Sequence, residues 1–125
     1  MRDVRSATAT GPYQQSIEIG AHHLIGDEGA DKGGQDAGPT PHELLLAALA
    51  TCTSMTMKAY AQHKGLPLRQ VHVTVRGRHD NGVFVLEKDV QLDGDLDEAQ
   101  RARILEIGGR CPVAKTLSGQ IRIVG

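Results

Sequence analysis

Short alternating runs of apolar and polar residues open the chain and predict β-strands. The alternation is followed by turn-forming pairs, Gly11-Pro12 and Gly20-Ala21, which separate one run from the next. We therefore predict a three-stranded meander within residues 1–25, with its β-prone runs at 6–10, 13–19 and 22–25.

The next apolar pattern has the continuous character of a helix. Residues 26–41 are rich in glycine and acidic side chains and predict an exposed loop. Thr40 can cap a helix that has Pro41 in its first turn, and Gly65 ends it, so we predict a helix over residues 41–64. Its first four turns are apolar on nearly every side, which places this helix in the middle of the structure.

The second half of the chain predicts a hairpin followed by helices. Val71, Val73 and Val75 alternate with polar residues, and Asn81-Gly82 separates them from a second run, which gives a β-hairpin over residues 69–92. Asp95 or Asp97 then caps a helix closed by Gly108-Gly109, Cys111-Pro112 opens a shorter one, and residues 121–124 read as a final strand within the segment 95–125. Strands grouped apart from helices indicate an α+β domain that spans residues 1–125.

Composition and charge narrow the class of protein. Lys and Arg number 14 against 15 Asp and Glu, interspersed along the chain, so neither nucleic acid nor a membrane surface is an expected partner. The chain has no leader-like start and no apolar run of membrane-spanning length, and we expect a cytoplasmic protein. Only three aromatic residues are available for the core, which favours an oligomer.

The two cysteines, Cys52 and Cys111, are the main candidates for chemistry. Two thiols are too few for a secreted disulfide framework, and they lack the paired spacing of a zinc site. Cys52 shares a helix face with apolar residues and can be a small packing residue. Cys111 precedes a proline at a helix start, beside Arg110, where a thiolate is favoured.

A metal site is a weaker reading of the same sequence. Six His, two Cys and the acidic residues of the 26–41 loop are available as ligands. However, His22 and His23 are adjacent and point to opposite faces of a strand, and the loop lacks the alternating oxygen ligands of a calcium site. We therefore expect neither a metal nor a cofactor.

Two segments of the chain resemble the OsmC-like family. They are residues 39–52, Pro-Thr-Pro-His-Glu-Leu-Leu-Leu-Ala-Ala-Leu-Ala-Thr-Cys, and residues 111–117, Cys-Pro-Val-Ala-Lys-Thr-Leu. The resemblance implies an intertwined homodimer with antiparallel sheets around two central helices. It also implies reduction of organic hydroperoxides, with Cys52 peroxidatic and Cys111 resolving, through a sulfenic acid and an intrachain disulfide.

A thiolate in an apolar pocket needs a cation. Cys52 lies roughly 16 Å along the helix from Pro41, too far for the positive helix end to help. The resemblance implies an Arg from the N-terminal hairpin, held by a Glu directly after the helix-initiating Pro. Here residues 11–24 contain no Arg, and His42 follows Pro41 with Glu43 one place later.

Arg5 is our first candidate for this cation, and His42 and Glu43 complete the predicted site with Cys52 and Cys111. The other candidate side chains are Arg76, Arg78, Arg110, His22 and His23.

The expected function is a thiol-dependent peroxidase that acts on organic hydroperoxides and is regenerated by an external dithiol reductant. The missing hairpin Arg favours one alternative, an OsmC-like dimer that binds an apolar small molecule without efficient peroxidase activity. A third reading is a structural dimer whose thiols do not react with peroxide.

Overall fold

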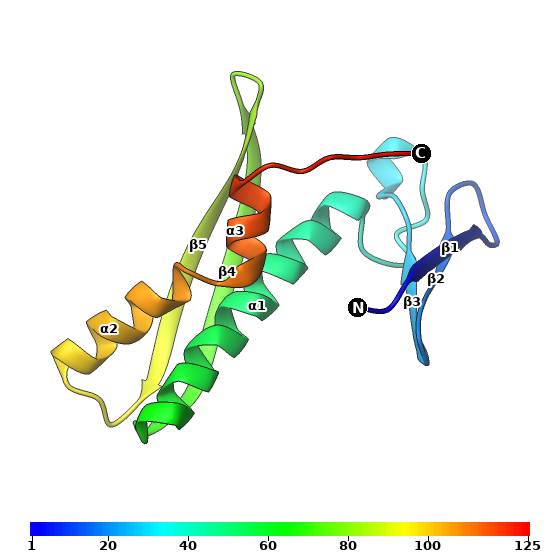
Figure 1. The fold of residues 1–125 in the computed structure, drawn as a ribbon. Coiled ribbons are helices and arrows are strands. Elements are labelled where there is room, and N and C mark those ends of the chain that lie inside the picture. The colour runs from blue at the N-terminus through cyan, green and yellow to red at the C-terminus, as the bar shows by residue number, and fades with distance from the viewer. The chain divides into compact units, whose positions relative to one another are not determined.

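The computed structural model describes all 125 residues and has an α+β fold with two antiparallel sheets. The chain divides into two compact units, residues 1–45 and 46–125, each described here by itself. The elements, labelled in Figure 1, are β1 (Val4–Thr8), β2 (Gln15–Ile19), β3 (His22–Gly26), the 3-10 turn η1 (Ala30–Lys32), α1 (Pro41–Lys64), β4 (Leu68–Asp80), β5 (Val83–Gly94), α2 (Glu98–Gly108) and α3 (Pro112–Ser118).

The N-terminal unit is the antiparallel meander β1-β2-β3 with its following loop. Val4 pairs with Ile19 across β1 and β2, and Ile17 pairs with Leu24 across β2 and β3, so these apolar side chains share one face of the sheet. Three strands are formed in the region where the sequence pattern predicts them.

A buried carboxylate organises the loop after β3. Asp27 is 3% exposed and accepts hydrogen bonds from the backbone N–H groups of Glu28 (2.8 Å), Gln35 (3.2 Å) and Ala37 (3.1 Å). The bond from Ala37, followed by those from Glu28 and Gln35, lowers the pKa of Asp27 below its ordinary 3.8 against the opposing effect of burial. The ionised side chain therefore holds a glycine-rich loop in one shape.

This carboxylate predicts a pH-dependent stability. Because the pKa of Asp27 is lowered in the folded state, its contribution is present above the unfolded-state value and is lost as the pH falls through the folded one. The gap in unfolding free energy between the wild type and Asp27→Asn should narrow as the pH falls below about 4. Urea unfolding at several pH values measures it, and a gap that is constant with pH would contradict this role.

Helix α1 is delimited by its own side chains. At its start, Thr40 Oγ1 accepts a hydrogen bond from the N–H of Glu43 (3.2 Å), and the Glu43 carboxylate accepts one from the N–H of Thr40 (2.8 Å), which is a capping box. At its end, Gly65 has a positive φ of 66°, and the N–H of Leu66 bonds to the carbonyl of Ala61. The helix covers the predicted range, 41–64.

Only one stripe of α1 is buried within the chain, although its first four turns are apolar on nearly every side. The buried residues recur every fourth position: Leu49, Thr53, Met57 and Ala61. Met55 on another face is 66% exposed. The physical reason is that one two-stranded hairpin can cover only one face of a helix.

By length and composition alone, α1 is long and apolar enough to cross a membrane, with a mean hydropathy of 1.2 over 18 residues. This differs from the expectation that no apolar run reaches membrane-spanning length. The core helix of a soluble protein passes the same test, so it is weak evidence for a membrane span.

The second unit packs α1, α2 and α3 along the β4–β5 hairpin (Figure 1). Asn81 and Gly82, with φ of 49° and 79°, form its turn, a conformation that glycine adopts without strain. Val73 pairs with Val90, so their side chains point to one face. The core on this face contains Met57 and Ala61 of α1, Leu68 of β4 and Ile104 of α2.

The predicted final strand is absent. Residues 121–124 have no strand pairing, and Ile123 is 93% exposed. A strand requires a hydrogen-bonded neighbour, and the alternating apolar residues of this segment find none within the chain. Helices α2 and α3 do form, and Asp97 rather than Asp95 caps α2, in a capping box with Gln100.

Candidate thiol site

Cys111 lies at the junction between α2 and α3, in a fully buried position. It is 0% exposed and is the N-cap residue of α3, where its Sγ accepts a hydrogen bond from the N–H of Ala114 at 3.3 Å. Pro112 fixes the first turn of this helix. The sequence therefore places a sulfur atom where a helix cap normally has an oxygen.

Cys52 and Thr53 of α1 face Cys111. Thr53 is 1% exposed, and its Oγ1 lies 3.6 Å from Cys111 Sγ. Cys52 is half-buried, and its thiol is near enough to Cys111 to lower the pKa of that cysteine. Both cysteines are reduced. The fold thus brings together two thiols that are far apart in the sequence.

The environment of Cys111 favours its thiolate. Burial alone raises the pKa of the Cys111 thiol, but hydrogen bonds from Thr53, Ala114 and Cys52 and the positive charge of Lys88 outweigh it, so that the pKa lies below its ordinary 9.0. These contacts therefore stabilise a negative charge on Cys111.

Lys88 is the cation that the sequence analysis missed. It lies on β5 between the inward-facing Leu86 and Val90, and its Nζ donates to the carbonyl oxygen of Gly108 at 3.4 Å. Its position in the alternation was a usable signal, because a charged side chain occurs there in a run of inward-facing apolar ones. Thr53 has a weaker signal, its place beside Cys52 on the helix.

A cavity of about 450 Å³ lies beside the segment that carries Cys111. It is bounded by Lys88 and by Gly109 and Ala114, the close neighbours of Cys111. Its remaining walls are mainly apolar: Leu49, Phe84, Leu86, Leu117 and Ser118. Its walls could contact the alkyl part of a small molecule.

The other predicted site residues lie elsewhere. Glu43 is used in the cap of α1, and His42 is exposed in the first turn of that helix. Arg5 is in the N-terminal unit, opposite Glu18 in the sheet register. The roles of Arg5, His42 and Glu43 toward Cys52 remain predictions.

The alternative cations have other partners. Arg76 and Arg78 form ion pairs with Asp89 and with Asp80 and Glu87, respectively, on the exposed face of the hairpin. Arg110 pairs with Glu106 at the surface. His23 contacts Ser16 Oγ across the meander, whereas His22 is exposed.

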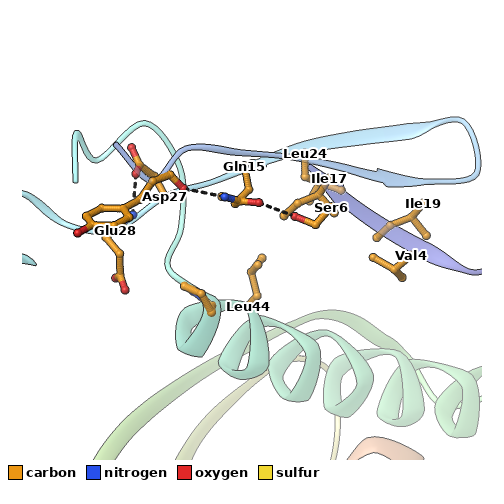
Figure 2. Close-up of a pocket in the computed structure, with 12 residues that line it drawn as sticks. Val4, Ser6, Gln15, Ile17, Ile19, Leu24, Asp27, Glu28 and Leu44 are labelled. Carbon is orange, nitrogen blue, oxygen red and sulfur yellow. Dashed lines mark hydrogen bonds between the residues drawn. The ribbon is translucent and has the colours of Figure 1, made fainter. Parts of the chain in front are cut away.

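A second cavity, of about 570 Å³, lies within the N-terminal unit. Figure 2 shows Ile17, Ile19 and Leu24 of the meander on one side, with Leu44 from the start of α1 facing them. Polar side chains, including Gln15 and Glu28, also line it. No group of three or more His, Cys, Asp or Glu side chains in the chain could hold a metal ion.

Comparisons with known proteins give the family. The model of the family described as OsmC-like protein matches residues 33–124. No curated protein matches the chain.

Several solved structures are similar. They are an OsmC-like protein from Mycoplasma pneumoniae (TM-score 0.78, 19% identity, 95% of this chain and 88% of that chain), the organic hydroperoxide resistance protein OsmC from Legionella pneumophila (0.71, 17%, 95% and 90%) and the organic hydroperoxide resistance protein OhrB of Bacillus subtilis (0.65, 19%, 95% and 91%).

At these identities the structural similarity shows a shared fold. The family match includes both Cys52 and Cys111 and extends over most of the chain. The chain therefore belongs to the OsmC-like family.

Proposed function

We propose that this protein is a thiol-dependent peroxidase that reduces organic hydroperoxides, with Cys52 as the peroxidatic and Cys111 as the resolving cysteine. The observation that carries the proposal is the placement of Cys111 against the Cys52–Thr53 segment of α1, with Thr53 Oγ1 3.6 Å from Cys111 Sγ, in surroundings that favour a thiolate. The names of the Legionella and Bacillus relatives, organic hydroperoxide resistance proteins, support the substrate class.

The burial of the two cysteines supports the order of their reactions. Cys111 is 0% exposed and cannot meet a bulky peroxide without movement, whereas Cys52 is half-buried. Cys52 is therefore the thiol that a substrate reaches first. The mainly apolar cavity beside the segment that carries Cys111 suits an alkyl chain better than it suits hydrogen peroxide.

The chemistry then follows in three balanced steps. The Cys52 thiolate attacks one peroxide oxygen, the O–O bond breaks, and the products are a sulfenic acid on Cys52 and an alkoxide that takes a proton to become the alcohol. The Cys111 thiolate next attacks the Cys52 sulfur, forming the disulfide as hydroxide leaves and is protonated to water. An external dithiol finally reduces the disulfide and is itself oxidised. We place this cycle in the cytoplasm, where dithiol reductants are available.

A single-turnover experiment tests the proposal. The reduced protein is mixed with one equivalent of an alkyl hydroperoxide or of hydrogen peroxide, and free thiols are counted over time. We expect loss of both thiols per chain, faster with the alkyl hydroperoxide, and a linked pair of peptides containing Cys52 and Cys111. Unchanged thiols or unlinked peptides would overturn the mechanism.

Methionine oxidation needs a control in this experiment. Met55 is 66% exposed, and its sulfoxide has the same mass increase as a cysteine sulfenic acid. The variant Met55→Leu removes this ambiguity and should retain the full loss of both thiols. Peptide mapping then assigns every added oxygen to a residue.

We also propose that the protein is a homodimer. The support is the apolar surface of α1 that the chain leaves uncovered, including Met55 (66% exposed) and Leu45 (43%). Burial of such surface against a second copy is favourable at roughly 25 cal/mol per Å². Sedimentation at micromolar concentration should give twice the 13.4 kDa chain mass, and a monomer would contradict this assembly.

The cavity of the N-terminal unit favours a second candidate function, binding of an apolar small molecule without efficient peroxidase activity. Its walls are mainly aliphatic, and its volume of about 570 Å³ suits a small ligand. A fluorescent fatty-acid probe tests this function. Probe binding that is weakened by Ile17→Asp, in a protein whose thiols survive peroxide, would favour it over the peroxidase.

A further inference from the structure

Lys88 occupies a position on β5 that a charged side chain rarely takes. Side chains of β5 alternate, and Lys88 points to the same face as Leu86 and Val90, with Val75 as its cross-strand partner. A lysine on an inward face loses hydration, a cost that is offset only by a compensating interaction. The one hydrogen bond of its ammonium, to Gly108 O at 3.4 Å, is long.

No carboxylate lies within ion-pair distance of Lys88. The acidic residues nearby in the sequence are paired at the surface: Glu87 with Arg78, and Asp89 with Arg76. The positive charge of Lys88 instead acts on Cys111. An anion on Cys111 would therefore give this half-buried ammonium a partner of opposite charge.

The groups facing Cys111 come from three elements. Helix α1 contributes the Thr53 hydroxyl and the Cys52 thiol, β5 contributes Lys88, and α3 contributes the N–H of Ala114. The charged neighbours along its own segment are Arg110, which is paired with Glu106, and the exposed Lys115. The Ala114 N–H donates to the sulfur, the Thr53 hydroxyl lies in a position to donate to it, and Lys88 adds a positive charge.

We infer that Thr53 and Lys88 are positioning residues that hold the resting negative charge of the thiol pair on Cys111. The use of this charge in turnover rests on the proposed function. There the Cys111 thiolate accepts the proton of the Cys52 thiol as Cys52 attacks the peroxide, and then gives that proton to the departing alkoxide. Cys111 is thereby a thiolate again, ready to attack the sulfenic acid.

This assignment differs from activation of Cys52 by a nearby arginine. The charge is stored on the buried partner and reaches Cys52 by transfer of one proton between the two neighbouring thiols. Such an arrangement requires no cation beside Cys52. It accounts for a peroxidatic cysteine in a chain that lacks an arginine between residues 11 and 24.

Titration of the Cys111 thiolate tests the inference without any peroxide. The variant Cys52→Ser leaves one thiol, whose ionisation is followed by the ultraviolet absorbance of the thiolate. In the Cys52→Ser protein, Lys88→Met and Thr53→Val should each raise the titration midpoint of Cys111 by roughly half a pH unit or more. Lys88→Arg and Thr53→Ser, which keep the charge and the hydroxyl, should restore it.

Lys115→Met is the matched control, because it removes an exposed lysine four residues after Cys111 and should leave the midpoint unchanged. Lys88→Gln replaces Lys88→Met if the latter does not fold by circular dichroism. If Lys88→Met and Thr53→Val have the same titration midpoint as their Cys52→Ser parent, the inference is overturned.

A second readout separates this inference from the peroxidase. If the protein turns over peroxide, Lys88→Met should slow disulfide formation below the midpoint by roughly threefold or more, and Lys88→Arg should not. If no peroxide is consumed, the shifted midpoints still support the placement of the charge while the proposed function fails. If peroxide is consumed and the midpoints do not move, the placement is wrong and the function stands.

Discussion

Replacing Cys52 by serine should lower the rate of organic hydroperoxide consumption by at least about a thousandfold, because a hydroxyl cannot replace a thiolate as the attacking group. Replacing Cys111 by serine should leave one oxidation per chain. The sulfenic acid then has no thiol to resolve it, and it accumulates or advances to sulfinic acid. Stopped-flow peroxide consumption and a sulfenic-acid-specific label measure the two outcomes.

The two variants should thus fail in different ways. Cys111→Ser should bind the label once per chain at Cys52, and Cys52→Ser should not bind it on the timescale of wild-type turnover. A useful control is Ser54→Ala, which removes a hydroxyl two residues from Cys52 and leaves both thiols. If Cys52→Ser consumes peroxide at the wild-type rate, Cys52 is not the peroxidatic residue.

Truncation of Ile104 to alanine should cost about 2–5 kcal/mol of unfolding free energy. Ile104 is 0% exposed and joins α2 to Met57 of α1 and to the inward face of the hairpin. The change leaves a cavity lined by side chains of α1, α2 and the hairpin, and these side chains cannot all move inward to fill it. Since small domains are stable by about 5–15 kcal/mol, this is a large share of the total.

Leu105→Ala is the matched control for this prediction, because Leu105 is the next residue on the same helix and is 45% exposed. It should cost less than about 1 kcal/mol. The unfolding free energies of both variants are compared by urea unfolding at one protein concentration. The slope of unfolding free energy against urea concentration should be the same for both. Equal losses for the two would show that the core does not depend on α2.

The sequence pattern predicts well those elements that are determined by local chemistry. The range of α1 follows from Thr40, Pro41 and Gly65, and the hairpin turn follows from Asn81-Gly82. The strand expected at residues 121–124 fails because alternation shows only what a strand would bury, and not whether a partner strand exists. The apolar pattern of α1 likewise does not show which elements cover each of its faces.

The residues of the candidate site show the same contrast between local sequence signals and contacts distant in the sequence. Cys52 and Cys111 were predicted from their motifs, and the structure brings them together. Thr53 and Lys88 were missed because they act on Cys111 from positions distant in the sequence. A count of charged residues at inward strand positions would have found Lys88, whereas nothing in the pattern around Thr53 distinguishes it from an ordinary helix threonine.

The contact between Thr53 and Cys111 spans 58 residues, and this has a consequence for how the protein folds. The hairpin pairs Asp80 with Val83 next to its turn and extends outward from there, so it can form early at little loop-closure cost. The thiol pair needs α1, the hairpin, α2 and α3 to be in place and is assembled last. During synthesis Cys52 leaves the ribosome well before Cys111, and until α3 docks both sulfurs are open to solvent. Newly made chains therefore depend on a reducing environment to reach the native thiol pair without cross-linking to one another.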